Sequence, residues 1–165
     1  MKKLLFLPFL LFAITAIAQP ELTLDESNAT VKFYFVEKKV PGSVDNFEAK
    51  VKFDPSNLSG SSISGSVDAS TINTGNKMRD KHLRSEDYFH VEKYPNFTFK
   101  STSITKTSKG YEMKGTMTIK GIEKPVTWTF TYEDGKFVAR TIINPDDYDI
   151  PKDSEVKIEV QVSVQ

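Results

Sequence analysis

The chain has 165 residues, with 22 basic and 22 acidic side chains and no cysteine. A formal net charge of zero leaves no electrostatic footprint for nucleic acid or for an anionic membrane surface. The lack of cysteine excludes disulfides, thiol catalysis and thiolate metal sites, so the stability of the fold has to come from packing.

The N-terminus has the pattern of a secretory signal peptide. Lys2 and Lys3 give it a positive start, residues 4–16 are almost wholly apolar, and residues 16–18 (Ala-Ile-Ala) place small side chains at a cleavage site. The apolar run is short for a membrane span. We therefore expect cleavage after Ala18 and a soluble protein in the periplasm or outside the cell, with an uncleaved membrane anchor as the alternative.

The remaining residues, 19–165, are enough for one domain with its own core. From residue 30 onward apolar and polar residues alternate, which is typical of β-strands with one buried face. Asp134-Gly135 lies between two such runs and predicts a type I′ hairpin, because Asp and Gly tolerate positive φ. The expected strands are 22–25 taken together with 30–37, 46–53, 62–70, 96–104, 111–120, 125–132, 136–143 and 155–163.

About eight sequential strands, each with one apolar face, form either a closed antiparallel barrel or a two-sheet sandwich. A barrel is favoured because closure removes exposed edges and encloses room for side chains or one slender ligand. We expect an all-β barrel and keep the sandwich as the alternative.

One segment breaks the strand pattern. Residues 75–95 are rich in charge and do not alternate, and either Asn76 or Thr74 can cap a short helix that runs to about Arg84. The sequence therefore predicts a short helical insertion around 76–90, between two strands.

No catalytic motif is found in the sequence. It has no G-x-S-x-G turn, no H-E-x-x-H pair and no phosphate-binding glycine loop. His82 and His90 are the only histidines, and their spacing to Asp80, Glu86 or Asp87 is no recognised metal pattern. We expect no enzyme, no cofactor and no metal, with a structural hydrogen bond at His82, and keep a metal-dependent hydrolase as the remote alternative.

Aromatic and methionine side chains dominate the predicted inward face, and they either fill the barrel as a core or line a hollow interior. A filled core would make the chain a structural or stress-related exported protein without a ligand. The side chains expected to point inward are Phe33, Phe35, Phe47, Val51, Phe53, Ile63, Val67, Phe97, Phe99, Met113, Met117, Ile119, Val126, Trp128, Phe130 and Phe137.

Four stretches are distinctive in content and order: residues 47–58 (Phe-Glu-Ala-Lys-Val-Lys-Phe-Asp-Pro, then Leu58), residues 68–75 (Asp-Ala-Ser-Thr-Ile-Asn-Thr-Gly), the segment 79–99 with Arg79-Asp80, His82-Leu83 and Tyr94-Pro95, and residues 115–126 with Met117-Thr118-Ile119-Lys120-Gly121. In these stretches the chain resembles the YceI-like family, exported polyisoprenoid-binding proteins with a lipocalin-like barrel.

The resemblance implies a hydrophobic tunnel that holds a polyisoprenoid, an isoprenoid quinone or a fatty-acid derivative, as carrier, store or scavenger. From the balanced charge and the short apolar run we expect no nucleic-acid partner and no stable membrane insertion, and a homodimer stays possible. Arg79, Asp80 and His82 are the candidates for a lid or a contact to the polar end of the ligand. Two departures affect one barrel end: residues 144–149 replace the usual Asn-Arg pair and Asp/aromatic/Gly step, and Asn46 stands where the family has glycine.

Overall fold

The structure is a computed structural model that describes residues 19–151 and 154–165; the expected signal peptide lies outside the described residues. The strands are β1 (Thr30–Phe35), β2 (Val40–Val44), β3 (Glu48–Lys52), β4 (Ser62–Asp68), β5 (Asn96–Thr107), β6 (Gly110–Ile119), β7 (Ile122–Glu133), β8 (Lys136–Ile143) and β9 (Val156–Ser163). The helix α1 (Lys77–Arg84) is accompanied by the 3-10 turns η1 (Glu26–Asn28), η2 (Leu58–Gly60), η3 (Ala69–Thr71) and η4 (Pro145–Tyr148). No helix among the described residues is both long and apolar enough to cross a membrane.

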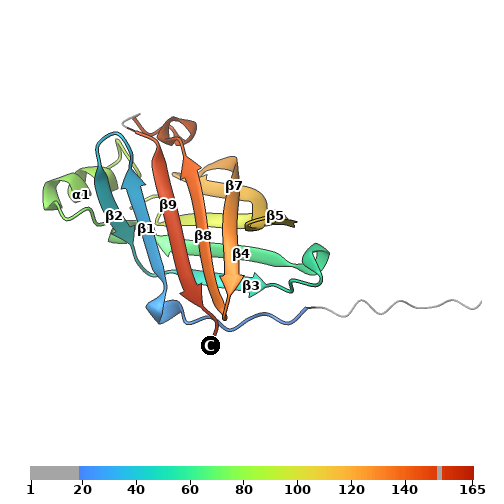
Figure 1. The fold of residues 1–165 in the computed structure, drawn as a ribbon. Helices are drawn as coiled ribbons and strands as arrows, with labels where there is room; N and C mark the ends of the chain where they lie inside the picture. The colour runs from blue at the N-terminus through green and yellow to red at the C-terminus, as the bar shows by residue number, and fades with distance from the viewer. Residues whose placement is uncertain (1–18, 152–153) are drawn as a thin grey trace, which may run out of the picture.

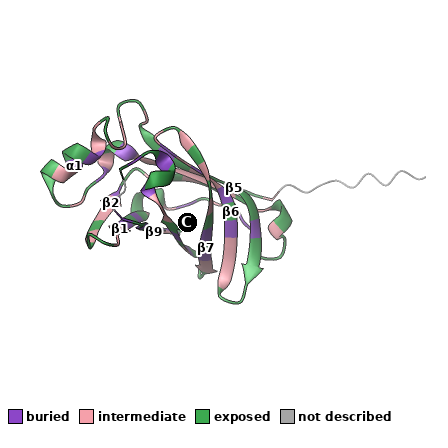
Figure 2. Ribbon diagram, turned by 90° about the horizontal axis from the view of Figure 1, so that it is seen from above, coloured by how far each residue is buried: buried purple, intermediate pink, exposed green. Residues whose placement is uncertain are grey.

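All nine strands belong to one antiparallel sheet with the order β2-β1-β9-β8-β7-β6-β5-β4-β3. The sheet curls, so that β3 and β4 run across β1, β9 and β8 on the far side (Figure 1). Seen from above, the strands turn around a common interior, and α1 lies to one side next to β2 (Figure 2). The expected antiparallel barrel is confirmed as a curled half-barrel of nine strands rather than about eight, and the two-sheet sandwich is wrong.

β2 and β3 are the two end strands of the sheet, and among the described residues no ladder of backbone hydrogen bonds joins them. A short connection, residues 45–47, links them, and it turns at Asn46 with φ 56°. Near this seam Leu22 pairs with Val51 of β3, while Leu24 pairs with Val164 beyond β9. The expected strand 22–25 is therefore a strap that ties two distant parts of the sheet together.

Two tight turns set the longest hairpins. Asp134 and Gly135 have φ 49° and 75°, which confirms the predicted type I′ turn between β7 and β8. Lys120 and Gly121 repeat this geometry, with φ 53° and 75°, between β6 and β7. The sequence did not predict the second turn, and β7 begins at Ile122, earlier than expected. The strand therefore includes Pro125. The proline lies in the part of β7 that does not pair with β8, where a missing N–H is tolerated.

The sequence analysis did not predict strand β2, whose five residues include Pro41 and Gly42, two residue types that are rare in strands. β2 lies at the end of the sheet, where a missing N–H costs little. Gly42 pairs with Phe33 of β1, and a Cβ at position 42 would overlap the Phe33 ring. The glycine thus gives the Phe33 ring the space in which it packs.

The helix α1 begins where the sequence predicted. Asn76 caps it by accepting hydrogen bonds from the backbone N–H groups of Met78 and Arg79, each at 3.1 Å. The buried Asp80 carboxylate accepts hydrogen bonds from the N–H (2.8 Å) and hydroxyl (2.5 Å) of Thr74, and Arg79 Nε donates to the same hydroxyl at 2.8 Å. Arg79 and Asp80 therefore both hold Thr74 and so fix the helix on the preceding loop.

We expect Asp80→Ala to lower the free energy of unfolding by about 1–3 kcal/mol, because the Thr74 N–H would lose its buried acceptor. Exposed Asp87, in the turn that follows α1, provides the control, and Asp87→Ala should have little effect. Urea denaturation measures the difference, and amide hydrogen exchange should show faster exchange in α1 for the Asp80 variant alone. Equal urea midpoints for the two variants would contradict the assigned role of Asp80.

Candidate functional site

An apolar cavity of about 180 Å³ lies inside the curled sheet. The buried core consists of two clusters, a large one around Phe53 and Trp128 and a small one around Phe33 and Leu83. Residues of both clusters line the cavity. The two walls of the sheet therefore do not pack fully against each other, and the interior is hollow in this conformation.

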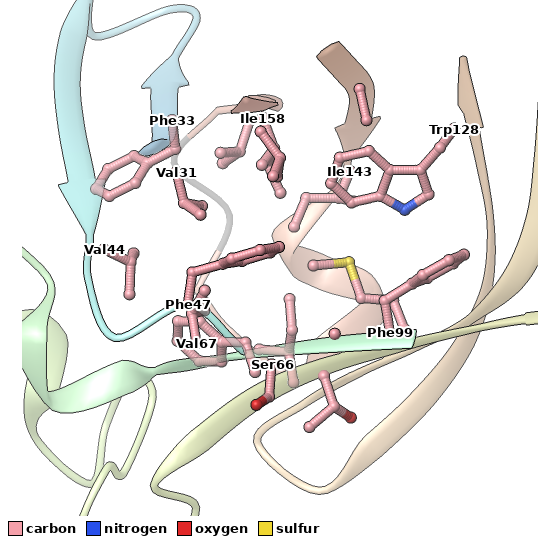
Figure 3. A pocket seen from close by; sticks show the side chains of 18 of the residues that line it. Val31, Phe33, Val44, Phe47, Ser66, Val67, Phe99, Trp128, Ile143 and Ile158 are labelled. Atoms are coloured by element: carbon pink, nitrogen blue, oxygen red, sulfur yellow. The ribbon is translucent and has the colours of Figure 1, made fainter. Parts of the chain in front are cut away.

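The sequence predicted most of the cavity wall. Of the sixteen side chains expected to point inward, all but Phe53 and Val126 line the cavity. Figure 3 shows Phe33 and Val44 on one side, Phe99 and Trp128 on the opposite side, and Phe47 between them. Val126 is excluded because it pairs with Gly115, whose face is covered by the Phe99 ring.

Phe53 is instead the centre of an aromatic cluster. Its ring makes edge-to-face contacts with Tyr111, Phe130, Tyr132 and Phe137, with centroid distances of 5.0–5.5 Å. Phe130 and Phe137 also line the cavity, so this cluster forms a solid floor at one end. The alternation identified the face on which Phe53 lies but not how far along the barrel the open space extends.

Several cavity residues come from segments that do not follow the strand pattern. The insertion contributes Leu83, Tyr88 and Phe89, and Ile72 lies in the loop before it. Pro145 comes from the divergent segment, and Ile150 directly follows that segment. Strand β9 was predicted with the right alternation, yet its inward side chains were not named as lining residues. In β9 the usable signal was the alternating Val156, Ile158, Val160 and Val162. The same alternation on other strands also marks four further lining residues that were not named, Val31, Ala49, Ala139 and Ile143.

The proposed lid residues Arg79, Asp80 and His82 do not line the cavity. Arg79 and His82 instead border a separate surface groove between α1 and β2, together with Lys38 and Lys81. This groove shares Phe35, Leu83 and Tyr88 with the cavity, so these apolar side chains separate the two spaces. The exposed His82 packs its ring against Tyr88, with the centroids 4.5 Å apart; this contact replaces the hydrogen bond expected for it.

Among the described residues, no group of three or more His, Cys, Asp or Glu side chains is arranged to hold a metal ion. The carboxylates with a lowered pKa lie at turns and on the outer face of the sheet. Hydrogen bonds from Ser56 lower the pKa of Asp54, and hydrogen bonds from Ser70 lower the pKa of Asp68. Both serve local backbone structure outside the cavity.

Tyr148 lies in η4, within the divergent segment, and is 1% exposed. Burial, helped by the negative charge of Asp147, raises the pKa of Tyr148 to about 12 from the ordinary 10.0. Its hydroxyl has no hydrogen-bond partner among the described residues. The fold therefore holds the neutral phenol and disfavours the phenolate.

The raised pKa of Tyr148 predicts a loss of stability at high pH. The stabilisation is complete below pH 10.0 and declines as the pH rises through about 12. We expect the unfolding free energy of the wild type to fall by about 2 kcal/mol more than that of Tyr148→Phe across this range. If the unfolding free energies of the two proteins changed in parallel with pH, the assignment to Tyr148 would be contradicted. Near neutral pH, Tyr148→Phe should lower the unfolding free energy only a little, because the hydroxyl has no hydrogen-bond partner among the described residues.

Gly115 shapes the wall next to Trp128, because a Cβ at this position would overlap the Phe99 ring and the Lys100 carbonyl oxygen. We expect Gly115→Ala to destabilise the fold by about 1–3 kcal/mol and to push Phe99 out of its place in the wall. Gly65→Ala is the control, since its Cβ would lie 3.3 Å from the nearest atom. Thermal unfolding of both variants tests this, and an equal loss for Gly65→Ala would contradict the special role of Gly115.

Comparison with solved structures gives the same fold. BcnA of Burkholderia cenocepacia superposes with a TM-score of 0.75 at 23% identity, covering 86% of this chain and 99% of that one. A YCEI protein of Campylobacter jejuni gives 0.62 at 24%, covering 76% of this chain and 85% of that one. A polyisoprenoid binding domain of Saccharophagus degradans, implicated in plant cell wall breakdown, gives 0.58 at 11%, covering 87% and 98%.

Curated relatives match a smaller part of the chain. The UPF0312 protein YE1254 of Yersinia enterocolitica is 36% identical over 86 residues, which are 52% of this chain and 45% of that protein. A UPF0312 protein of Yersinia pestis is 35% identical over the same length. The match thus spans about half the length of these curated relatives. The YceI-like domain model, in contrast, matches residues 22–165, and on this match the chain belongs to the YceI-like family.

Proposed function

We propose that this protein is an exported binding protein that encloses an apolar chain, as carrier, store or scavenger. The observation that carries the proposal is the hollow, apolar interior of the curled sheet. The ligand class is a polyisoprenoid, an isoprenoid quinone or a fatty-acid derivative. A polyisoprenoid binding domain with the same fold supports this choice.

The size of the cavity limits what fits without rearrangement. A cavity of about 150 Å³ lined by apolar side chains takes up benzene, so the 180 Å³ here suits a short chain segment. A longer chain has to shift flexible wall residues such as Met113 and Met117, or leave past Leu83 and Tyr88. Burial of about ten methylenes would supply roughly 8 kcal/mol before the costs of association.

The insertion is proposed as the lid. Leu83, Tyr88 and Phe89 cover one side of the cavity, and α1 is held by its cap, by the Thr74–Asp80 contact and by the packing of Leu83 in the smaller core cluster. A ligand whose polar end leaves the cavity past Leu83 would meet Arg79 and His82 in the groove outside. Movement of this segment would admit and release the ligand without opening the sheet.

Export is proposed from the pattern of residues 1–18. The two lysines, the apolar run and the small residues before Gln19 match a cleaved leader. N-terminal sequencing of the protein secreted or released from the periplasm should begin at Gln19.

The main test is whether the purified protein carries a chain and whether the cavity holds it. We expect organic extraction and mass spectrometry to find a stoichiometric long-chain lipid. Lipid added to delipidated protein should change the fluorescence of Trp128, the one tryptophan of the chain. An empty extract together with unchanged fluorescence would contradict the proposal.

Matched variants locate the binding. Ala139 faces the cavity, whereas Thr129 on the neighbouring strand is exposed and points outward. Ala139→Phe should weaken lipid binding by at least about 10-fold by filling space, and Thr129→Phe should leave it unchanged. Ala49→Leu, a milder filling of the same cavity, replaces Ala139→Phe if the latter is unfolded by circular dichroism. Equal affinity in the filled and control variants would place binding elsewhere.

A further inference from the structure

The outward side of α1 carries positive charge and one exposed apolar side chain. The exposed residues of the helix are Lys77, Met78, Lys81 and His82. At about 100° per residue, these four fall on one continuous arc of the helix surface. Asp80, the one acidic residue of α1, is buried and hydrogen-bonded inside the fold. The outward side of α1 is therefore basic, with no carboxylate of the helix among its exposed residues.

Met78 is the most exposed large apolar side chain in the part of the chain that the structure describes. It is 83% exposed, and the next is Ile142 on β8, at 55%. A single exposed apolar residue is common on protein surfaces. Met78, however, borders an apolar groove together with Phe35 and Val40. The Met78 side chain contributes little to folding where it lies, and contact with an apolar phase would remove it from water.

The groove beside α1 extends the same basic surface. Lys38 borders it from the turn between β1 and β2, and Lys81 borders it from α1. Asp87 is the one carboxylate among the groove residues. The helix projects from one side of the sheet, beyond β2 (Figure 1), and most of its surface is exposed (Figure 2). A large, flat partner can therefore reach this surface without contacting the sheet first.

We propose that the outward side of α1 docks reversibly on a lipid bilayer that contains anionic phospholipids. Met78 lies among the acyl chains, and Lys77 and Lys81 bind the lipid phosphates. Lysine suits this position because its apolar stem can lie against acyl chains while its ammonium group reaches the phosphates. Methionine is flexible and adapts to an irregular apolar surface. Interfacial helices bind membranes by this combination of apolar contact and attraction to anionic lipids.

The docking is weak and reversible. The chain has a formal net charge of zero, so the attraction comes from the local charges of α1 rather than from the whole molecule. Such attraction acts within about one Debye length, about 10 Å at 0.1 M salt. Each basic residue close to an anionic surface contributes about 5-fold to the affinity. Two lysines and one methionine can hold the protein at a membrane for a short time and still release it.

The docking surface lies next to the proposed lid. Leu83 and Tyr88 border both the groove and the cavity. In a docked protein, a chain that passes between them would move between the cavity and the bilayer with little exposure to water. An acidic protein would also satisfy the lysines, but its presence would not explain why the surface adjoins the lid. This last argument rests on the proposed function, whereas the charge and the exposure of α1 do not.

Vesicle sedimentation tests the docking. Delipidated protein is mixed with vesicles of phosphatidylcholine alone or of phosphatidylcholine with phosphatidylglycerol. We expect it to sediment with the anionic vesicles only, and to be released at about 1 M salt, where the Debye length is about 3 Å. The double variant Lys77→Gln with Lys81→Gln should bind the anionic vesicles about 20-fold more weakly. Lys106→Gln with Lys109→Gln removes the same charge from the exposed β5–β6 hairpin and should keep the wild-type affinity.

Single cysteines show which side of the protein meets the bilayer, because the chain has no cysteine of its own. Met78→Cys and Ile142→Cys each receive a polarity-sensitive fluorophore on the thiol. Both side chains are exposed, so neither substitution should disturb folding. We expect anionic vesicles to shift the emission of the probe at position 78 to shorter wavelength and to leave the probe at position 142 unchanged.

The results separate the docking from the proposed function. If the protein does not sediment with anionic vesicles at low salt, the inference is overturned, and an acidic protein becomes the occupant to test. Equal weakening by the two pairs of lysine substitutions, or no response of the probe at position 78, overturns it as well. Lipid in the extract of a protein that binds no vesicles removes the docking alone. Vesicle binding by a protein whose extract is empty removes the proposed function alone.

Discussion

One sheet with nine strands has an apolar face too large for the eight-residue helix α1 to cover, so this face has to be buried against itself. The sheet achieves this by curling. A register shift between Ser101 and Ser103 in β5 adds to the bend. Gly115 of β6 leaves room for the Phe99 ring, which a Cβ at this position would overlap. Because the curl brings opposite walls near each other without full contact, burial of the core and the presence of a cavity have the same cause.

The two ends of this interior differ in character. At one end Phe53 and the four rings around it pack edge to face, and such packing resists rearrangement. At the other end Leu83 and Phe89 belong to an insertion held by the cap of α1, the buried Asp80 carboxylate, the hydrogen bond from Arg84 to the Ile72 carbonyl oxygen and the packing of Leu83 in the smaller core cluster. One end of the interior is thus closed by the insertion, and the other by a ring cluster that belongs to the sheet itself.

Local patterns in the sequence predicted the strands and the inward face, because alternation and the Asp134–Gly135 turn depend on neighbouring residues alone. They failed where the outcome depends on distant contacts. β2 was missed because its proline and glycine are tolerated only at a sheet end beneath the Phe33 ring. The wall residues Ile72 and Phe89 belong to an irregular segment whose position no periodicity encodes. Whether the interior is filled or hollow depends on the curvature of the whole sheet, and the position of Phe53 depends on it as well.

The seam between β2 and β3 leaves two strand edges that could template pairing with another molecule. Each edge carries its own protection. β2 is five residues long, includes Pro41, and its Ser43 exchanges backbone hydrogen bonds with Asn73. β3 is equally short, presents Lys50 to solvent, and has part of its edge occupied by Leu22. A half-barrel built this way can stay unsealed, and so deformable around a guest, without becoming a nucleus for intermolecular β-aggregation.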